Sequence, residues 1–134
     1  NVDLPIASIM RSKYNAYKEY HTSLDNLKYV SKKGLNGGYK IIDKVVDIFM
    51  KNNIPKTRIV CEPFLSKRNM TNYISIKTSN YVNSRKNILN FLTYSDGSND
   101  LVDIANFIEL SFSETYEICE KLKFYKLIEC STLK

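Results

Sequence analysis

The sequence has few of the residues on which self-contained catalytic sites are usually built. Its 134 residues include one histidine, His21, and three widely spaced cysteines, Cys61, Cys119 and Cys130. Because no two cysteines form a Cys-x-x-Cys pair, neither a zinc knuckle nor a disulfide framework is indicated. Any Ser-His-Asp or Cys-His mechanism would have to use His21 alone. Most self-contained enzyme chemistries are therefore excluded.

Glycine is scarce, and long apolar runs are absent. The four glycines do not have the spacing of a Walker loop or a dinucleotide fingerprint. The apolar run at residues 41–50 is interrupted by Asp43, Lys44 and Asp47, so it falls short of the roughly 18 apolar residues of a membrane span. The first ten residues lack the basic start and the apolar stretch of a signal peptide. We therefore expect a cytoplasmic protein with no membrane contact.

Charge is distributed unevenly along the chain. The net charge of +6 separates into +8 for residues 1–80, with 14 Lys and Arg against 6 Asp and Glu, and −2 for residues 81–134, with 6 against 8. Such a change of electrostatic character indicates a domain boundary near residue 80. The apolar content suits a globular protein, although two separate cores would each be small.

The first part of the chain contains one strong helical pattern, in which apolar residues recur on one face until Pro55 ends it. Thr22 followed by Asp25 resembles a capping box and predicts a short helix. Gly34 and the two glycines after it are expected to separate this helix from the stronger one. The elements predicted here are a helix at 22–30, a helix at 39–52, an irregular stretch at 56–72 and a strand at 73–78.

The second part has the rhythm of a winged helix-turn-helix domain. Asn99 or Asp100 is expected to cap its second helix, and Ser113 with Glu114 to open the third. Three helices with a tight turn between the second and third, followed by a strand, define this arrangement. The predicted elements are helices at 84–94, 101–108 and 113–123, and a strand at 127–130.

Four blocks of sequence resemble one family. They are Leu4-Pro5-Ile6-Ala7-Ser8-Ile9-Met10-Arg11-Ser12, Glu19-Tyr20-His21-Thr22-Ser23, Cys61-Glu62-Pro63-Phe64-Leu65-Ser66-Lys67-Arg68, and Ser95-Asp96-Gly97 with Leu101-Val102-Asp103-Ile104-Ala105. In this order they resemble the C-terminal end of bacterial zinc-dependent aminopeptidase-like exopeptidases, in the branch with an added winged helix. The resemblance implies an α+β chain: the C-terminal fragment of an α/β zinc-exopeptidase domain over residues 1–80, followed by a winged helix-turn-helix domain over residues 81–134.

The same resemblance assigns roles to two residues of a His-Thr-x-x-Asp motif. It implies that His21 is a metal ligand in the intact protein, where zinc-activated water hydrolyses a peptide or a related amide. It also implies that Asp25 orients the loop behind His21, whereas the residues themselves favour Asp25 as part of the helix cap begun by Thr22. The family's catalytic Glu and its other ligands lie upstream and have no counterpart here. We therefore assign no catalytic residue and no bound cofactor to this chain alone.

A DNA-binding regulator is the alternative that the winged helix raises. DNA readers of this type carry Arg, Lys, Asn or Gln at the start of the third helix. This sequence has Glu114, Glu117 and Glu120 there, and a domain of negative net charge is repelled by phosphates. We therefore expect no nucleic-acid partner, and we interpret the winged helix as a packing or interaction module.

The expected partners are the remainder of the catalytic domain or a second copy of the chain, with a peptide-like substrate in the intact protein. Tyr17 and Tyr20 are candidates for lining a substrate cleft, although loop tyrosines more often pack on a neighbouring surface. Lys67 and Arg68 lie in a basic stretch that is either solvated or paired with acidic surface elsewhere in the intact protein. A non-enzymatic interaction module remains a third interpretation, with an apolar patch formed by Ile6, Ile9, Ile42, Val45 and Phe49.

Overall fold

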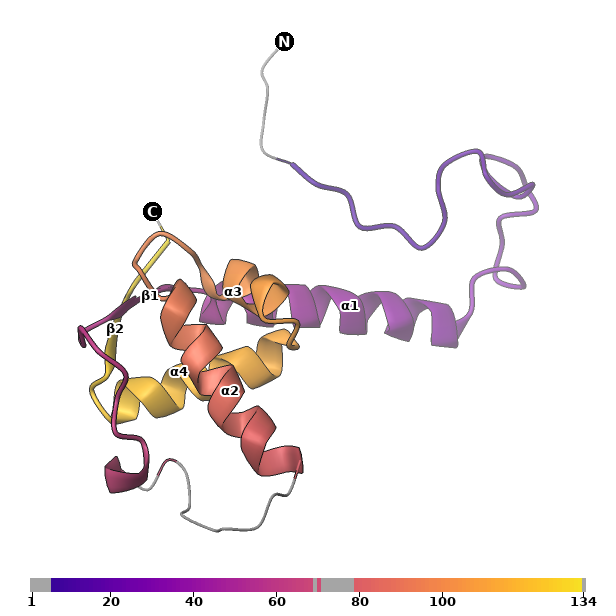
Figure 1. Cartoon of the computed structure of the whole chain (residues 1–134). Helices are drawn as coiled ribbons and strands as arrows, with labels where there is room; N and C mark the ends of the chain where they lie inside the picture. The colour runs from indigo at the N-terminus through magenta and orange to yellow at the C-terminus, as the bar shows by residue number, and fades with distance from the viewer. Residues whose placement is uncertain (1–5, 69, 71–78, 134) are drawn as a thin grey trace. The chain divides into compact units, whose positions relative to one another are not determined.

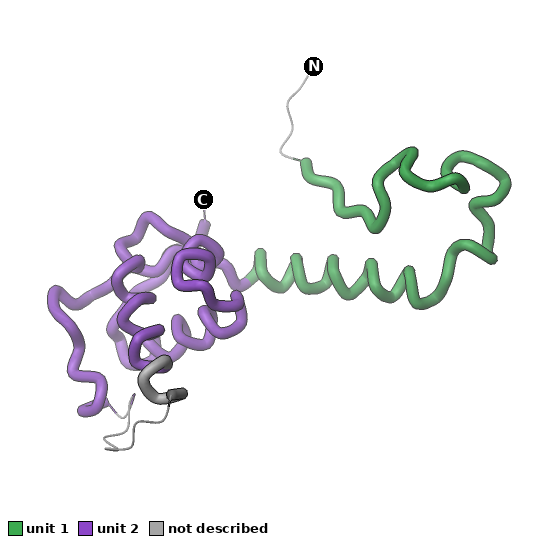
Figure 2. Tube along the Cα trace, turned by 45° about the vertical axis from the view of Figure 1, so that its right-hand side comes forward, with its two compact units in different colours: residues 1–50 green, residues 51–134 purple. Residues whose placement is uncertain are grey.

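The computed structural model describes residues 6–68, 70 and 79–133. The chain divides into two compact units, unit 1 (residues 1–50) and unit 2 (residues 51–134) (Figure 2). The strand expected at 73–78 lies outside the described residues. Helices combined with one small sheet make the chain α+β, as the sequence predicts.

The described residues of unit 1 form turns followed by one helix. Residues 6–31 form neither helix nor strand, so the helix predicted at 22–30 is wrong. Instead, Thr22 Oγ1 accepts a hydrogen bond from the backbone N–H of Leu24 at 3.2 Å, which closes a local turn. Leu24 and Leu27 are both exposed in these turns.

Helix α1 (Lys32–Lys51) is longer than the predicted helix at 39–52 and runs through three glycines expected to interrupt it. Ser31 Oγ accepts from the Gly34 N–H at 3.1 Å, as a residue that caps a helix does. Arg11 Nη1 donates to the Gly34 carbonyl at 3.1 Å, and a Cβ added at Gly37 would lie 3.1 Å from the same nitrogen. The glycines thus allow the guanidinium to approach the helix backbone.

Unit 2 has the architecture of a winged helix-turn-helix domain (Figure 1). Its elements are β1 (Ile54–Thr57), a 3-10 turn (Ser66–Arg68), α2 (Ser79–Tyr94), α3 (Leu101–Phe107), α4 (Phe112–Phe124) and β2 (Ile128–Ser131). β1 pairs antiparallel with β2, with Ile54 opposite Ser131 and Thr57 opposite Ile128. The three predicted helices and the final strand are confirmed, whereas β1, which overlaps only the start of the irregular stretch expected at 56–72, was not predicted.

The start of β1 is fixed to α3 by side-chain hydrogen bonds. Asn52 Nδ2 donates to Asp100 Oδ2 at 3.0 Å, and Asn52 Oδ1 accepts from the Leu101 N–H at 3.0 Å. Residues 51–80, which charge alone groups with the first part of the chain, thus supply a strand to the winged-helix unit. The boundary between the compact units therefore lies after residue 50, where strand pairing begins, and not near residue 80, where the net charge changes sign.

The helix-turn-helix is built from local capping interactions. Asp100 caps α3 by accepting from the Asp103 N–H at 2.9 Å, one of the two caps expected from the sequence. Glu109 follows α3 with a left-handed φ of 56°, and the Leu110 N–H returns to the Ala105 carbonyl at 3.0 Å, as in a Schellman motif. Helix α4 then begins at Phe112, slightly before the predicted start.

Capping of α4 gives a first prediction. Ser111 Oγ accepts from the Glu114 N–H, and Glu114 Oε2 accepts from the Ser111 N–H, which completes a capping box. Ser111→Ala is expected to lower the free energy of unfolding by about 1 kcal/mol, as measured by urea denaturation. The matched control is Ser113→Ala, inside the helix, which should change it much less; equal effects would contradict the capping role.

The same capping box predicts a pH dependence. Hydrogen bonds from Ser111 to the carboxylate lower the pKa of Glu114. A lowered pKa in the folded state stabilises the fold fully above the pKa of a free glutamate, about 4.3. That stabilisation is lost as the pH falls through the lower, folded-state pKa.

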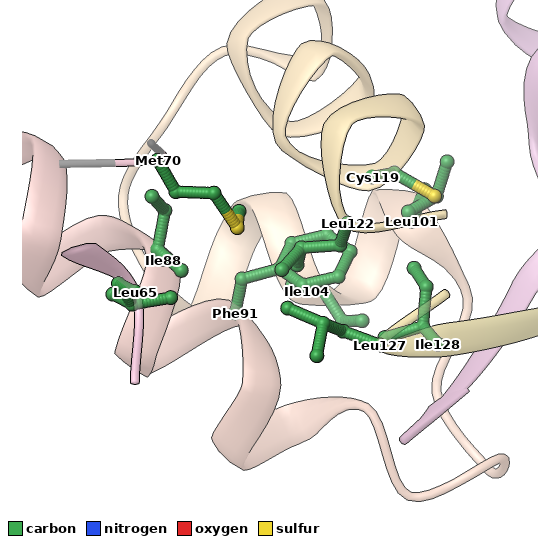
Figure 3. Packing of buried hydrophobic residues seen from close by; sticks show 10 residues of the cluster. All are labelled: Leu65, Met70, Ile88, Phe91, Leu101, Ile104, Cys119, Leu122, Leu127 and Ile128. Atoms are coloured by element: carbon green, nitrogen blue, oxygen red, sulfur yellow. The ribbon is translucent and has the colours of Figure 1, made fainter. Parts of the chain in front are cut away.

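The hydrophobic core lies entirely in unit 2 among the described residues, between the three helices and β2 (Figure 3). Pairs spaced by three residues on each helix point into it, as expected for the buried face of a helix. The core cluster comprises Leu65, Met70, Ile88, Phe91, Leu101, Ile104, Cys119, Leu122, Leu127 and Ile128. Within the described ranges, no helix is both long enough and apolar enough to cross a membrane.

Candidate functional site

His21 lies in the turns that precede α1, with an exposed side chain. Its φ of 56° places it in the left-handed region, which is uncommon for residues other than glycine. Its ring stacks on the ring of Tyr20, with centroids 4.2 Å apart and planes 16° apart. One face of the imidazole is thus covered, while the side chain as a whole stays accessible to a partner.

His21 does not by itself make a metal centre. In the part of the chain that the structure describes, no three His, Cys, Asp or Glu side chains are placed to hold one ion. A catalytic zinc usually has three protein ligands and a water molecule. The described residues therefore do not by themselves form a complete zinc centre.

Asp25 is exposed and caps no helix, because no helix follows it. The helix-cap interpretation of Thr22 and Asp25 is therefore wrong. Asp25 instead acts on Tyr17: partial burial and, next in size, the negative charge of Asp25 raise the pKa of the Tyr17 phenol. The role of Asp25 in orienting the loop behind His21 stays a prediction.

Four tyrosines around His21 form an aromatic cluster, which we call the tyrosine cluster: Tyr14, Tyr17, Tyr20 and Tyr29. Tyr17 stacks on Tyr29 with centroids 5.6 Å apart and meets Tyr20 edge to face at 5.7 Å. Tyr14 lies 5.6 Å from Tyr20. Aromatic contacts of this geometry hold the turns together in the absence of helix or strand hydrogen bonds.

A hollow of about 640 Å³ opens beside the tyrosine cluster and reaches the first turn of α1. Its wall includes Tyr17, as proposed for a cleft, but not Tyr20. Arg11 and Asp25 also line it, so aromatic faces are combined with one cation and one anion. Sequence reasoning missed Arg11; the high density of tyrosines at 14–29 was the signal that pointed toward this region.

The basic residues after α1 serve local structure. Arg68 Nη1 donates to the Phe64 carbonyl at 3.3 Å. The side-chain stem of Lys56 lies against the turn at Gly97, where an added Cβ would be 3.2 Å from Lys56 Cδ. Arg85 forms an ion pair with Glu62 at 2.7 Å. These contacts stabilise the stretch locally and join it to α2 and to the turn at Gly97. Lys67 is exposed.

The exposed side of α4 is acidic near its N-terminus. Glu114 accepts the capping hydrogen bonds, which keep its pKa low and the side chain ionised at neutral pH. Glu120 pairs with Lys123 at 3.1 Å, and Glu117 is exposed. Beside them, a hollow of about 390 Å³ between α2 and α4 has Glu114 and Glu117 on its wall. The negative charges at the start of α4 and on the wall of this hollow would repel the phosphates of a nucleic acid.

Two of the cysteines meet in unit 2, a proximity that sequence reasoning missed. Cys119 Sγ lies 3.7 Å from Cys130 Sγ, and Cys119 is fully buried. Burial is the largest factor raising the pKa of both thiols. They are therefore protonated at neutral pH and belong to the packing of α4 on β2.

Comparison with known proteins separates the same two parts of the chain. Residues 50–130 match the winged helix-turn-helix family, and residues 1–53 match a family described as a domain of unknown function. A Clostridium acetobutylicum protein, provisionally named a polysaccharide biosynthesis protein with an aminopeptidase-like domain, is 38% identical over 109 residues. That alignment covers 78% of this chain and 24% of the relative.

A solved structure is similar over nearly the whole chain. This crystal structure, of a protein from Clostridium acetobutylicum provisionally named a peptidase, has a TM-score of 0.70 and 28% sequence identity. The similarity covers 87% of this chain and 25% of that protein. The chain therefore spans about a quarter of the length of each relative.

Proposed function

Because the chain belongs to the winged helix-turn-helix family, we propose that its winged helix is the accessory module of a zinc-dependent aminopeptidase-like hydrolase. The residues before the winged helix are the C-terminal end of the hydrolase's catalytic domain in this proposal. The whole enzyme hydrolyses a peptide or a related amide, and the present chain supplies only part of the site.

The extent of the two similarities carries this proposal. Unit 2 comprises 84 of the 134 residues, less than two thirds of the chain, whereas the alignments cover 78% and 87% of it. Both alignments therefore extend into residues 1–50. A shared winged helix alone would say little about function, because that fold serves many. Alignments that also include residues 1–50 support the proposal that this chain and its relatives have the same kind of catalytic domain.

His21 is a zinc ligand in the proposed enzyme, and the remaining ligands come from outside this chain. Its accessible side chain and its left-handed turn support this role. Backbone conformations of this kind persist where the surroundings stabilise them, often at functional sites. Zinc, when bound, supplies an activated water for hydrolysis. Asp25, four residues after His21, orients the turn.

The winged helix is an interaction module in this account. Phe124, on α4, is 78% exposed. The rings of Tyr94 and Phe107, at the ends of α2 and α3, lie 5.0 Å apart with their planes tilted by 37°. Exposed aromatic side chains are typical of protein-binding surfaces. A DNA-binding regulator stays the alternative, and the charges on α4 oppose it.

A binding experiment separates these two roles. The protein is expected to show no affinity for duplex DNA at 50 mM salt, because Glu114 and Glu117 repel phosphates from the exposed side of α4. Fluorescence anisotropy with labelled duplexes measures this directly. Binding that weakens steeply with salt, and that Lys121→Glu weakens further, would establish the DNA-binding role instead.

Metal analysis tests the proposed enzyme. The native gene product is expected to have roughly three to four times the 15.6 kDa mass of this chain, in line with its relatives, and to contain zinc as purified. His21→Ala should lower the zinc content sharply, whereas Lys18→Ala, an exposed neighbour, should leave it unchanged. Unchanged zinc in the His21 variant would remove His21 from the ligand set.

A further inference from the structure

We propose that the apolar face of α1 is a docking surface for the catalytic part of the hydrolase that lies outside this chain. This inference rests on the proposed function, because it takes its partner from that longer protein. The partner surface is apolar.

The apolar side chains of α1 are left uncovered. None of its 20 residues is buried, although the helix is strongly amphipathic. The large hydrophobic side chains more than half exposed are Leu35, Tyr39, Ile41, Ile42, Val46, Phe49 and Met50. Exposed apolar patches of this kind mark interaction surfaces.

Unit 1 has no core of its own to cover this face. Every described residue from 6 to 50 is exposed or only partly buried, and Leu27 is 91% exposed. The turns before α1 are held by aromatic stacking and a few local hydrogen bonds. A segment with so little buried surface does not maintain tertiary structure alone, so its fold depends on a partner.

The shape of the apolar face indicates a domain surface rather than a single partner helix. At 100° per residue, the apolar positions from Ile48 through Leu35 to Met50 cover roughly 200° of the circumference. Lys40 lies at the centre of the opposite, polar side. A two-stranded coiled coil uses a much narrower seam, whereas a broad stripe is typical of a helix packed on a globular core.

The charges of α1 lie mostly away from its apolar face. The helix carries five lysines and two aspartates, a net charge of +3. At 100° per residue, Lys33, Lys40, Lys44 and Lys51 fall on the polar side, opposite the apolar positions. The two relatives, of which this chain spans about a quarter, supply ample further chain for a globular surface that covers the apolar face.

Hydrogen exchange on the full-length protein tests the docking surface. In the wild type, the amides of α1 are expected to exchange at least 100-fold more slowly than an unprotected peptide. Ile42→Asp should reduce this protection at least tenfold and leave α3 and α4 unchanged. Lys40→Asp introduces the same side chain on the opposite side and should change neither. Ile42→Ala provides a milder variant if Ile42→Asp does not accumulate as folded protein.

Three results would overturn the docking proposal: equal protection in the Ile42 variants and the wild type, protection that disappears on dilution as in a dimer, or an α1 that is unprotected in the native gene product. None of these measurements depends on metal or on activity. A protected α1 in a protein without zinc at His21 would reject the proposed chemistry alone. Zinc at His21 with an unprotected α1 would reject the docking surface alone.

Discussion

His21→Ala in the full-length protein is expected to lower the hydrolysis of an aminoacyl amide by more than 100-fold. A catalytic zinc that usually has three protein ligands would keep only two, and the activated water would lose its metal. Asp25→Asn should have a smaller effect, about 10–100-fold, the range found for residues that orient metal ligands. Initial rates for both variants, with circular dichroism to verify folding, measure the difference.

The Lys18→Ala variant is the control for these rates, because Lys18 is an exposed residue of the same turns. It should retain wild-type activity. If His21→Ala kept more than half of the activity, the imidazole would have no part in the reaction. If Asp25→Asn were as severe as His21→Ala, Asp25 would be closer to the reaction than an orienting residue.

The largest effect on stability is expected for Phe91→Ala. Phe91 on α2 is fully buried within the core cluster of unit 2 (Figure 3). Truncation of a buried phenylalanine costs about 3–5 kcal/mol, since it removes apolar contacts and leaves a cavity. This is a large part of the roughly 5–15 kcal/mol by which small domains are stable. Urea denaturation followed by circular dichroism measures the loss.

Phe124→Ala provides a matched control for this prediction. It makes the same chemical change on a side chain that is 78% exposed. The free energy of unfolding should change by no more than about 0.5 kcal/mol. Similar effects of the two substitutions would mean that the core does not lie where the structure places it.

The helices of unit 2 were predictable because their signals are local. Apolar residues at helical spacing and the predicted cap Asp100 lie within a few residues of one another, whereas α4 is capped by Ser111 and not opened at Ser113 as predicted. The strand β1 was not predictable in this way. It contains Pro55, which argues against a strand, and its partner β2 lies more than 70 residues away in the sequence.

In unit 1, local sequence patterns predicted the wrong structure. Thr22 and Asp25 have the spacing of a helix cap, but the residues that follow form turns. The three glycines of α1 lower helix propensity by about 1 kcal/mol each relative to alanine. The helix nevertheless runs through them, and Arg11 approaches its backbone at Gly34 and Gly37.

The candidate site was only partly predictable, because some of its residues come together only through the fold. His21 and Asp25 were found through a motif of five consecutive positions. Arg11, which lines the hollow beside the tyrosine cluster, carries no motif. It reaches this hollow only because the chain turns back on α1.

Anomalous X-ray scattering at the zinc edge, from crystals of the full-length protein, would show whether His21 is a zinc ligand. We expect one zinc peak about 2.0–2.1 Å from a ring nitrogen of His21, with further ligands from residues outside this chain. A zinc ion held entirely by other residues, with the His21 ring free of metal, would contradict this expectation.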